Sequence, residues 1–179
     1  MIDPRRRALL RGRIVDVTAP HAPAVQRPPW ALHEEAFTAR CVRCHACVDS
    51  CPRHVIRLGD GGFPAMEFFR QGCDFCAGEP ACEAACEPQA LNRAARQQAW
   101  PDWKIAVSDQ CLARRQVECR SCGDACDARA IRFKPAPGGI AQMQLDRAAC
   151  TGGGECVGVW PVGAVRMTHA TLKLVSDGE

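Results

Sequence analysis

Short apolar runs recur along this chain, separated by segments that are rich in cysteine, glycine and proline. Three of these runs have the length and composition of strands, and a cysteine follows each of them within a few residues. They span residues 63–69, 103–107 and 140–145. The segments 59–62 and 135–139 contain the Gly and Pro residues that supply the backbone angles of tight turns. This pattern predicts small strand and turn units in place of one large core.

The apolar runs belong to a sequence repeat with four copies. In each copy an anchor residue is followed at fixed offsets by a small or β-branched residue and then by an aliphatic one, as in Cys51-Pro-Arg-His-Val-Ile. A repeat of this period is typical of a supersecondary unit that is too small to fold alone. We therefore predict an α+β fold built from two pairs of such units. The anchors are Cys51, Cys86, Cys126 and Trp160, which lie 35, 40 and 34 residues apart.

Two stretches suggest domain boundaries. Residues 92–98 have the composition of a linker or a helix end, and Pro101 then blocks the continuation of any helix. Four prolines between residues 18 and 29 disfavour regular structure and indicate an extended arm. The predicted parts are a basic, proline-rich arm at 1–30, a first domain at 31–100, a second domain at 101–170 and a tail at 171–179.

Cysteine dominates the composition, with 14 Cys against six Phe, four Trp and no Tyr. A high, even number of cysteines indicates either a disulfide framework in a secreted chain or metal ligation in a reducing compartment. The N-terminal apolar run, Ala8-Leu9-Leu10, ends at Arg11 and is shorter than the roughly 7 to 15 apolar residues of an export signal. No stretch reaches the roughly 18 apolar residues of a membrane span. We therefore expect a cytoplasmic, metal-binding protein without a transmembrane segment.

The formal net charge of +3 comes largely from five arginines within the first thirteen residues. Such a basic arm suits an acidic partner or a membrane surface, and it is equally compatible with a solvated tail that binds nothing. We expect no nucleic-acid partner. The sequence contains no nucleophile and base pair, phosphate loop or dinucleotide fingerprint, so we expect no independent catalysis.

The first cysteine motif predicts an iron-sulfur cluster. The run CVRCHACVDSCP, residues 41–52, has the spacing C-x2-C-x2-C-x3-C-P, which is the bacterial ferredoxin pattern. Three closely spaced thiolates bind irons of one 4Fe-4S cluster, and the fourth binds a neighbouring cluster. Zinc sites favour two separated CxxC pairs or mixtures of Cys and His, so zinc is the weaker interpretation. His45 and His54 are expected at the surface or behind the ligands. The α+β fold is accordingly expected to be tandem bacterial-ferredoxin-like modules, loop-rich and stabilised by clusters.

The second motif keeps the order of the ligands but has three extra residues, including Pro80, between its second and third cysteines. Cross-ligation between the first two motifs gives two complete 4Fe-4S sites, as in two-cluster ferredoxins. The predicted ligand sets are Cys41, Cys44 and Cys47 with Cys86, and Cys73, Cys76 and Cys82 with Cys51.

The third and fourth motifs are less regular. The third has a longer first gap, and the fourth has Gly153 and Trp160 where the repeat requires ligands. Cross-ligation then leaves two sets of three thiolates. A 3Fe-4S cluster, a 4Fe-4S cluster with one iron open to another ligand, and an empty half all remain possible. The two sets are Cys111, Cys119 and Cys122, and Cys126, Cys150 and Cys156.

Beyond the cysteines, the chain resembles the NapF family, the ferredoxin-type accessory proteins of periplasmic nitrate reductase systems, along nearly its whole length. The resemblance implies a cytoplasmic iron-sulfur protein, and its partner would be the catalytic subunit of periplasmic nitrate reductase, which it would help to mature before export. Gly153, Trp160 and the insertion before Cys82 depart from the family pattern of four complete clusters. The resemblance is carried by Arg6-Arg7, RPPWALHEEAF at 27–37, Trp100, CLARRQVECRSCGDAC at 111–126 and AIRFKP at 130–135.

Two other functions fit the sequence. An electron-transfer subunit of a redox enzyme would use tandem ferredoxin modules as a wire, although two incomplete sites argue against long-range conduction through the second half. A free electron carrier is disfavoured by the positive net charge. Trp30, Trp100 and Trp103 are expected to pack across the small modules, with a role in docking as the alternative.

Overall fold

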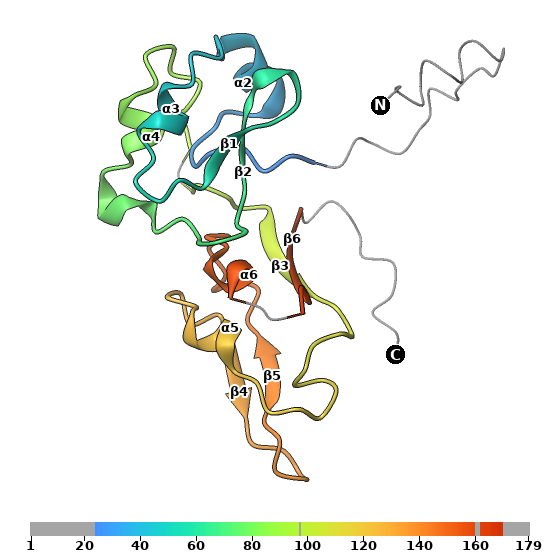
Figure 1. The fold of residues 1–179 in the computed structure, drawn as a ribbon. Helices are drawn as coiled ribbons and strands as arrows, with labels where there is room; N and C mark the ends of the chain where they lie inside the picture. The colour runs from blue at the N-terminus through green and yellow to red at the C-terminus, as the bar shows by residue number, and fades with distance from the viewer. Residues whose placement is uncertain (1–23, 97, 160–161, 170–179) are drawn as a thin grey trace, which may run out of the picture.

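The computed structural model of this protein describes residues 24–96, 98–159 and 162–169. The molecule is elongated and has two halves, one following the other along its length (Figure 1). The first half contains α2, α3, α4, β1 and β2, and the second contains β3, α5, β4, β5, α6 and β6. The helices are α2 Glu34–Arg40, α3 Ala46–Asp49, α4 Ala81–Ala84, α5 Ser121–Asp124 and α6 Glu155–Gly158, with 3-10 turns at Asp60–Gly62 and Phe75–Gly78. The strands are β1 Ile56–Leu58, β2 Pro64–Met66, β3 Trp103–Val107, β4 Ile131–Lys134, β5 Gln142–Leu145 and β6 Val165–His169.

Four of the short helices occupy the same place in the four copies of the sequence repeat. The helices α3, α4, α5 and α6 begin at residues 46, 81, 121 and 155, each five residues before its anchor position at 51, 86, 126 or 160. Extended pairing resumes five residues after each anchor, at residues 56, 91, 131 and 165. The repeat in the sequence is therefore also a repeat in the structure.

Each repeat also reverses its chain in the same way. The residue three positions after the anchor has a positive φ in every copy: 49° at His54, 54° at Gln89, 49° at Arg129 and 62° at Gly163. In the first three copies its backbone N–H donates to the anchor's carbonyl oxygen, at 2.8 to 3.0 Å. This left-handed residue turns the chain from the helix into the following strand.

In the first half, β1 and β2 form an antiparallel hairpin in which Ile56 lies opposite Met66. A single antiparallel bridge joins Ala31 to Leu91 and closes the half on itself. The core contains Phe37, Val55 and Ile56, together with Trp100 and the two buried cysteines, Cys51 and Cys82. The described part of the predicted arm, residues 24–30, packs here as well, with Pro28 and Pro29 among the fully buried side chains. The remainder of that arm, including the five arginines of its first thirteen residues, lies outside the described residues.

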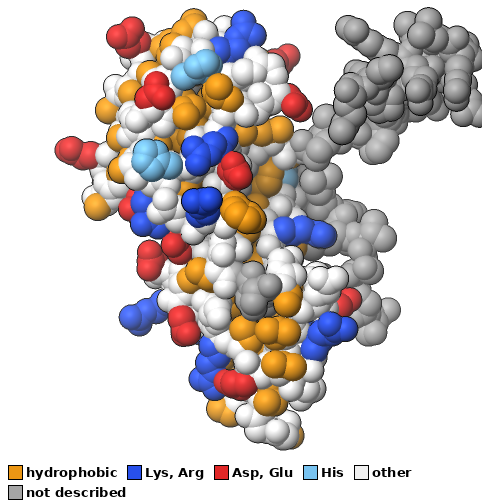
Figure 2. All heavy atoms as spheres, in the orientation of Figure 1, with side chains coloured by type: hydrophobic (Ala, Val, Ile, Leu, Met, Phe, Trp, Pro, Cys, Tyr) orange, Lys and Arg blue, Asp and Glu red, His pale blue; other side chains and the backbone are white. Residues whose placement is uncertain are grey.

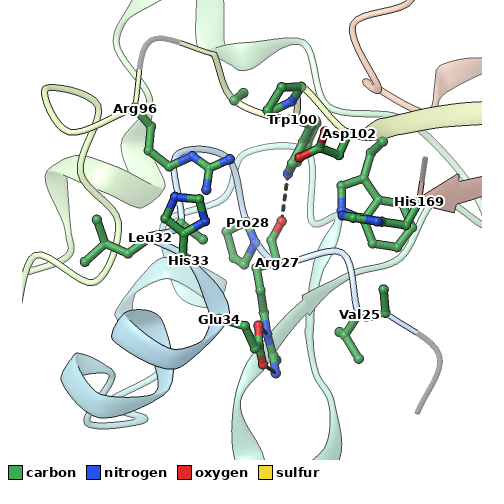
Figure 3. Close-up of a pocket in the computed structure, with 15 residues that line it drawn as sticks. Val25, Arg27, Pro28, Leu32, His33, Glu34, Arg96, Trp100, Asp102 and His169 are labelled. Carbon is green, nitrogen blue, oxygen red and sulfur yellow. Dashed lines mark hydrogen bonds and ion pairs between the residues drawn. The ribbon is translucent and has the colours of Figure 1, made fainter. Parts of the chain in front are cut away.

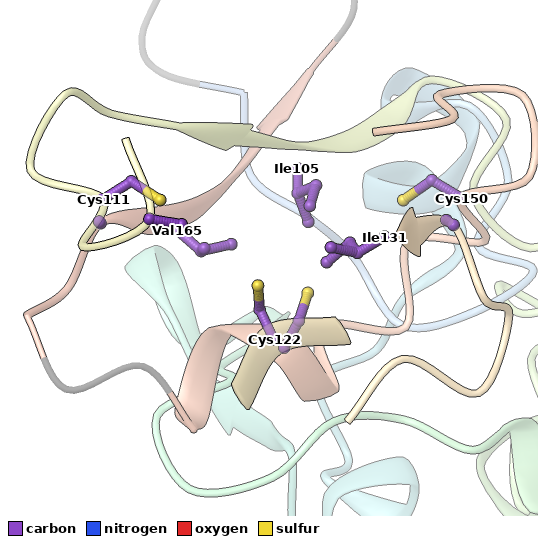
Figure 4. Packing of buried hydrophobic residues seen from close by; sticks show 10 residues of the cluster. Ile105, Cys111, Cys122, Ile131, Cys150 and Val165 are labelled. Atoms are coloured by element: carbon purple, nitrogen blue, oxygen red, sulfur yellow. The ribbon is translucent and has the colours of Figure 1, made fainter. Parts of the chain in front are cut away.

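The second half repeats this plan with longer strands. The strands β4 and β5 form the inner hairpin, and β3 pairs with β6 as the outer antiparallel pair, with Ile105 opposite Met167. Aliphatic and cysteine side chains share the core. Figure 4 shows Cys111, Cys122 and Cys150 pointing inwards toward Ile105, Ile131 and Val165.

The chain between the halves is held by aromatic side chains. The indole Nε1–H of Trp100 donates to the carbonyl oxygen of Arg27 at 2.9 Å, and the ring of Trp103 makes an edge contact with His169. The Arg27 guanidinium is paired with Glu34 at the start of α2. These residues line a cavity of about 440 Å³ between the N-terminal segment, α2 and the β3–β6 pair (Figure 3). Trp100 itself is buried in the core of the first half, where its ring contacts Phe68 and Phe75.

A second set of contacts forms a seam between the segment 68–76 of the first half and the loop 151–158 of the second. The Glu155 carboxylate accepts from Arg53 at 2.7 Å and from the Gly72 N–H at 2.6 Å. Glycine makes this approach possible. A Cβ at Gly72 would lie 2.2 Å from the backbone nitrogen of Glu155, and one at Gly154 would lie 2.4 Å from the ring of Phe68.

The expected strands are present, although two are shorter than the apolar runs that predict them. The run 103–107 coincides with β3, whereas β2 and β5 occupy 64–66 and 142–145. Both predicted turns join the two strands of a hairpin. On the face drawn in Figure 2, acidic and basic side chains are interspersed over both halves. Of the helices in the described ranges, none has the length and apolarity needed to cross a membrane.

Candidate metal centres

The thiols of the first predicted set converge on one cavity. Cys41, Cys44, Cys47 and Cys86 line it together, with Phe37, Ala90 and Leu91 among their neighbours. The loop that carries the first three is tight, because Arg43 and His45 both have positive φ. Cys47 lies on α3, and Cys86 arrives from the second repeat, after α4. The backbone N–H of Leu91 donates to Cys86 Sγ at 3.4 Å.

The thiols of the second predicted set line another cavity. Cys51, Cys73, Cys76 and Cys82 face it, under Pro29, Val55 and Ile56. The insertion of the second motif forms the 3-10 turn at 75–78, where Phe75, Cys76 and Ala77 all have positive φ. The carboxylate of Asp74 accepts from the Cys76 N–H at 2.9 Å and fixes this turn. Despite the longer loop, Cys82 thus lines the same cavity as Cys73 and Cys76.

The six cysteines of the second half form two neighbouring groups of three, with Cys122 of one group close to Cys156 of the other. Cys111, Cys119 and Cys122 lie around the start of α5, and Cys122 is fully buried. Cys126, Cys150 and Cys156 line a larger cavity of about 310 Å³. The two cavities of the first half are far smaller, about 20 and 10 Å³.

Burial and neighbouring thiols raise the pKa of the most enclosed cysteines. Burial is the main cause in each case, raising the pKa of Cys47 to about 11 and those of Cys73, Cys82, Cys122 and Cys156 to about 12. The neighbouring thiols that raise the pKa further belong mostly to the same group, but Cys47 of the first set also raises the pKa of Cys82, and Cys156 of the other group is the first such neighbour of Cys122. For Cys47 they are Cys86, Cys41 and Cys44; for Cys73, Cys51 and Cys76; for Cys82, Cys73, Cys51, Cys76 and Cys47; for Cys122, Cys156, Cys111 and Cys119; and for Cys156, Cys126 and Cys150.

These groups suit cationic iron. All fourteen cysteines are free thiols. A metal ligand must be deprotonated, so buried thiols that repel one another as thiolates need a positively charged group between them. Sets made of thiolates alone are the ligands of 4Fe-4S clusters. No three His, Cys, Asp or Glu side chains within the described ranges converge closely enough to hold a single metal ion. The assignment of each cysteine as a cluster ligand remains a prediction.

The two irregular positions of the fourth motif differ in what can be said of them. Trp160 lies outside the described residues. Gly153 is described, and its carbonyl oxygen accepts from the backbone N–H of Cys73 at 2.7 Å. A Cβ at Gly153 would lie 2.8 Å from the carbonyl oxygen of Cys73. Where the fourth motif lacks its second cysteine, the backbone of Cys73 therefore packs against Gly153 as part of the seam.

Several residues that shape these centres were not predicted from the sequence. Arg53, Gly72 and Glu155 form the seam beside Cys73, and no local pattern pairs residues so far apart. The left-handed residues after the anchors do have a sequence signal, since Gly163 occupies that offset in the fourth repeat. His45 and His54 are both exposed, as expected.

Comparison with known proteins decides the family. Residues 37–57 match the model of a 4Fe-4S binding domain. The chain is 39% identical over 164 residues, 92% of its length and 94% of the relative's, to the ferredoxin-type protein NapF of Escherichia coli K12. The chain belongs to the NapF family of ferredoxin-type proteins. The NapF of Haemophilus influenzae is 38% identical over 90% of this chain and 92% of its own length. The methylamine utilization ferredoxin-type protein MauM of Methylobacillus flagellatus is 36% identical over 83% of this chain and 67% of its own.

Membership of the NapF family and the matched domain identify 4Fe-4S clusters as the cofactor of this protein. The matched segment contains Cys41, Cys44, Cys47 and Cys51, all four cysteines of the first motif. The protein is therefore an iron-sulfur protein of the ferredoxin type, with small mixed helix and strand content.

Proposed function

We propose that this protein is an iron-sulfur accessory protein that assists maturation of the catalytic subunit of periplasmic nitrate reductase in the cytoplasm, before that subunit is exported. It would deliver electrons or cluster components to the unexported subunit. In this proposal the chain consists of two tandem ferredoxin-like modules, divided near residue 100. The first holds two complete 4Fe-4S sites, and the second holds two sites with three thiolates each.

The observation that carries the proposal is the likeness to NapF proteins over 92% of the chain, together with the grouping of the fourteen cysteines. The likeness extends well beyond the cysteine motifs, which alone would indicate only a ferredoxin. The grouping adds chemistry, because two four-thiolate cavities suit stable clusters, whereas a three-thiolate cavity leaves one position without a protein ligand.

The residues around the first two sites have defined tasks. When bound, a 4Fe-4S cluster accepts or donates one electron. The thiolates of Cys41, Cys44, Cys47 and Cys86 would hold the first cluster, and those of Cys51, Cys73, Cys76 and Cys82 the second. The N–H of Leu91, donating to Cys86 Sγ, would favour the reduced and more negative state of the first cluster, since hydrogen bonds to the sulfurs tune reduction potentials. Aliphatic neighbours such as Val55 would exclude water from the second.

A binding experiment tests the proposal. The tagged full-length chain is used to capture the nitrate reductase catalytic subunit, either with its export leader or as the exported form, under anaerobic reducing conditions. We expect a complex with the unexported form and a weaker complex, or none, with the exported one. The iron content of catalytic subunit made with and without this chain is measured in parallel. The absence of a complex, combined with full iron content without the chain, would contradict the proposal.

A second candidate is an electron-transfer subunit of a redox enzyme. The Cys73 N–H to Gly153 hydrogen bond favours it, because this contact places a residue of the second set beside the loop that carries Cys150 and Cys156. Such a subunit would reduce and reoxidise all of its sites at the rate of enzyme turnover. Stopped-flow reduction of the holoprotein distinguishes the two functions. Slow or incomplete reduction of the sites in the second half would argue against the electron-transfer function.

A further inference from the structure

One cavity of the molecule is lined from both halves and contains cysteines. Cys126, Cys150 and Cys156 lie on its second-half side, and the segment from Cys73 to Phe75 lies on the first-half side. The four-thiol cavities of the first half are lined by that half alone. The three-thiol site therefore has an additional wall that the complete sites lack.

This wall lies where the missing ligand would be. Gly153 occupies the second cysteine position of the fourth motif, and the ring of Phe75 would lie 3.6 Å from a Cβ there. The carbonyl oxygen of Cys73, at 2.8 Å, leaves no room for a side chain without movement of the backbone. Cys73 itself groups with Cys51 and Cys76. A fourth thiolate from this chain therefore has no room at position 153. That position nevertheless borders the cavity.

The lining of the cavity is acidic. Asp74, Asp127 and Glu155 line it, and the Arg53 guanidinium beside it pairs with Glu155 at 2.7 Å and with Asp74 at 4.0 Å, so these four side chains together carry a charge of −2. A cleft lined by one sign of charge raises the local concentration of ions of the opposite sign and their rate of arrival. Iron leaves and enters an iron-sulfur cluster as Fe²⁺, so this lining suits the passage of a divalent cation and not that of an anion or a thiolate.

We infer that Cys126, Cys150 and Cys156 form an iron-exchange site. The three thiolates hold three irons, and the fourth iron, which has no protein thiolate, leaves and returns through the acidic cavity. Release requires loss of one electron from the cluster to an oxidant and dissociation of one Fe²⁺, which leaves a 3Fe-4S cluster with all three irons ferric. Return takes one Fe²⁺ and one electron from a reductant. The inference rests on the cluster-carrying part of the proposed function and is independent of the partner.

Labelling the exchanged iron tests the inference. The full-length holoprotein is oxidised anaerobically with ferricyanide in the presence of a chelator and examined by EPR for the signal of an oxidised three-iron cluster. It is then incubated with ⁵⁷Fe²⁺ and dithionite and examined by Mössbauer spectroscopy. We expect the EPR signal to appear and then disappear, with label in one iron position of one cluster. Retention of all iron on oxidation would overturn the inference.

Variants locate the exchange. Cys156→Ser should abolish the reversible EPR signal, whereas Cys119→Ser, which removes a thiol of the other three-thiolate set, should retain it. The opposite result would place the exchange in the other set and overturn the assignment. These measurements use the purified protein alone. A failed capture of the nitrate reductase subunit together with intact exchange would therefore contradict the proposed function only.

A charge variant tests the route. Asp127→Asn should slow the uptake of ⁵⁷Fe²⁺ at low ionic strength by about threefold or more, with the difference shrinking in salt. Asp124→Asn is the matched control, because Asp124 is an exposed carboxylate at the end of α5 that does not line the cavity. Equal rates in the two variants would rule out passage through the acidic lining.

Discussion

The guanidinium of Arg53, in the first half of the chain, lies 2.7 Å from the carboxylate of Glu155, at the start of α6 in the second half. The same carboxylate oxygen accepts the Gly72 N–H, and Arg53 Nε donates to the Gly72 carbonyl oxygen at 3.1 Å. Three residues from distant parts of the sequence therefore form one closed hydrogen-bonded group. It lies next to Cys73, and so joins the two halves beside a predicted cluster ligand.

Replacing Glu155 by Gln removes the charge of its pair with Arg53 but keeps the size of the side chain. Both side chains are about one third exposed, at 32% and 35%, so solvent screens the pair and its worth is about 1 kcal/mol. Glu155→Gln should lower the thermal midpoint of the anaerobic holoprotein by about 2 to 4 °C at fixed scan rate. Arg57→Gln, which breaks the more exposed pair with Glu67, is the control and should change the midpoint by less. Equal effects of the two variants would show that the seam pair has no special role.

The glycine at the open corner is required by packing. A side chain at Gly153 would press on the backbone oxygen of Cys73, so Gly153→Ala should destabilise the holoprotein by roughly 1 to 3 kcal/mol, as overpacked sites do. Gly153→Cys should be no more stable and should fail to add a fourth ligand. Iron content and EPR of this variant check the second point. A gain of one stable 4Fe-4S cluster would mean that the backbone at Cys73 and residue 153 moves apart easily enough to admit the cysteine side chain.

Cross-ligation can be tested by additivity. If Cys51 serves the second site, Cys51→Ala and Cys76→Ala should each lower the iron content by about four per chain, and their combination should lose no more than either alone. Cys51→Ala combined with Cys44→Ala should instead lose about eight, because two sites are affected. Iron and acid-labile sulfide per chain are the measurements. Loss of the first cluster in Cys51→Ala alone would show that each motif binds its own cluster.

The left-handed residues after the anchors predict a difference between repeats. Gly163 has a φ of 62°, where a side chain costs roughly 1 to 2 kcal/mol, so Gly163→Ala should lower the stability by about that amount. Gln89 already bears this strain at a φ of 54°, so Gln89→Gly should be neutral or slightly stabilising. The two thermal midpoints, measured on proteins with equal iron content, provide the check. A destabilising Gln89→Gly variant would indicate that its side chain contributes contacts that outweigh the strain.

Removal of the clusters should remove the fold of the second half. Its core consists of ten buried residues, four of which are cysteines, and its longest strands have five residues. Because structural metal groups contribute their binding energy to folding, the iron-free protein should lose its cooperative thermal transition and its near-ultraviolet circular dichroism. A retained transition after complete removal of iron would show that the aliphatic residues suffice.

The repeat allowed much of this architecture to be predicted from the sequence. The run 103–107 coincides with a strand, because it is a local pattern, whereas the repeat predicted an α+β fold without locating the four short helices that precede the anchor positions. The partner of that strand, β6, lies more than fifty residues away, and pairing over such a distance has no local signal. The run 63–69 gives a strand of only three residues, since Phe68 turns inwards against Trp100 and Gly154. In the first half the thiols line two cavities in the predicted groups of four, whereas in the second half Cys122 also lies close to Cys156 of the other predicted set. The seam at Gly153 could not be predicted from the motif that it interrupts.

The glycines of the seam also constrain how the molecule moves. Where Gly72 meets Glu155 and Gly154 meets the ring of Phe68, the two surfaces fit without space for even one added carbon atom. Sliding of one half along the other would therefore first require the backbones to separate at Gly72 and at Gly154. The two halves are in direct backbone contact there, unlike two ferredoxins joined only by a tether.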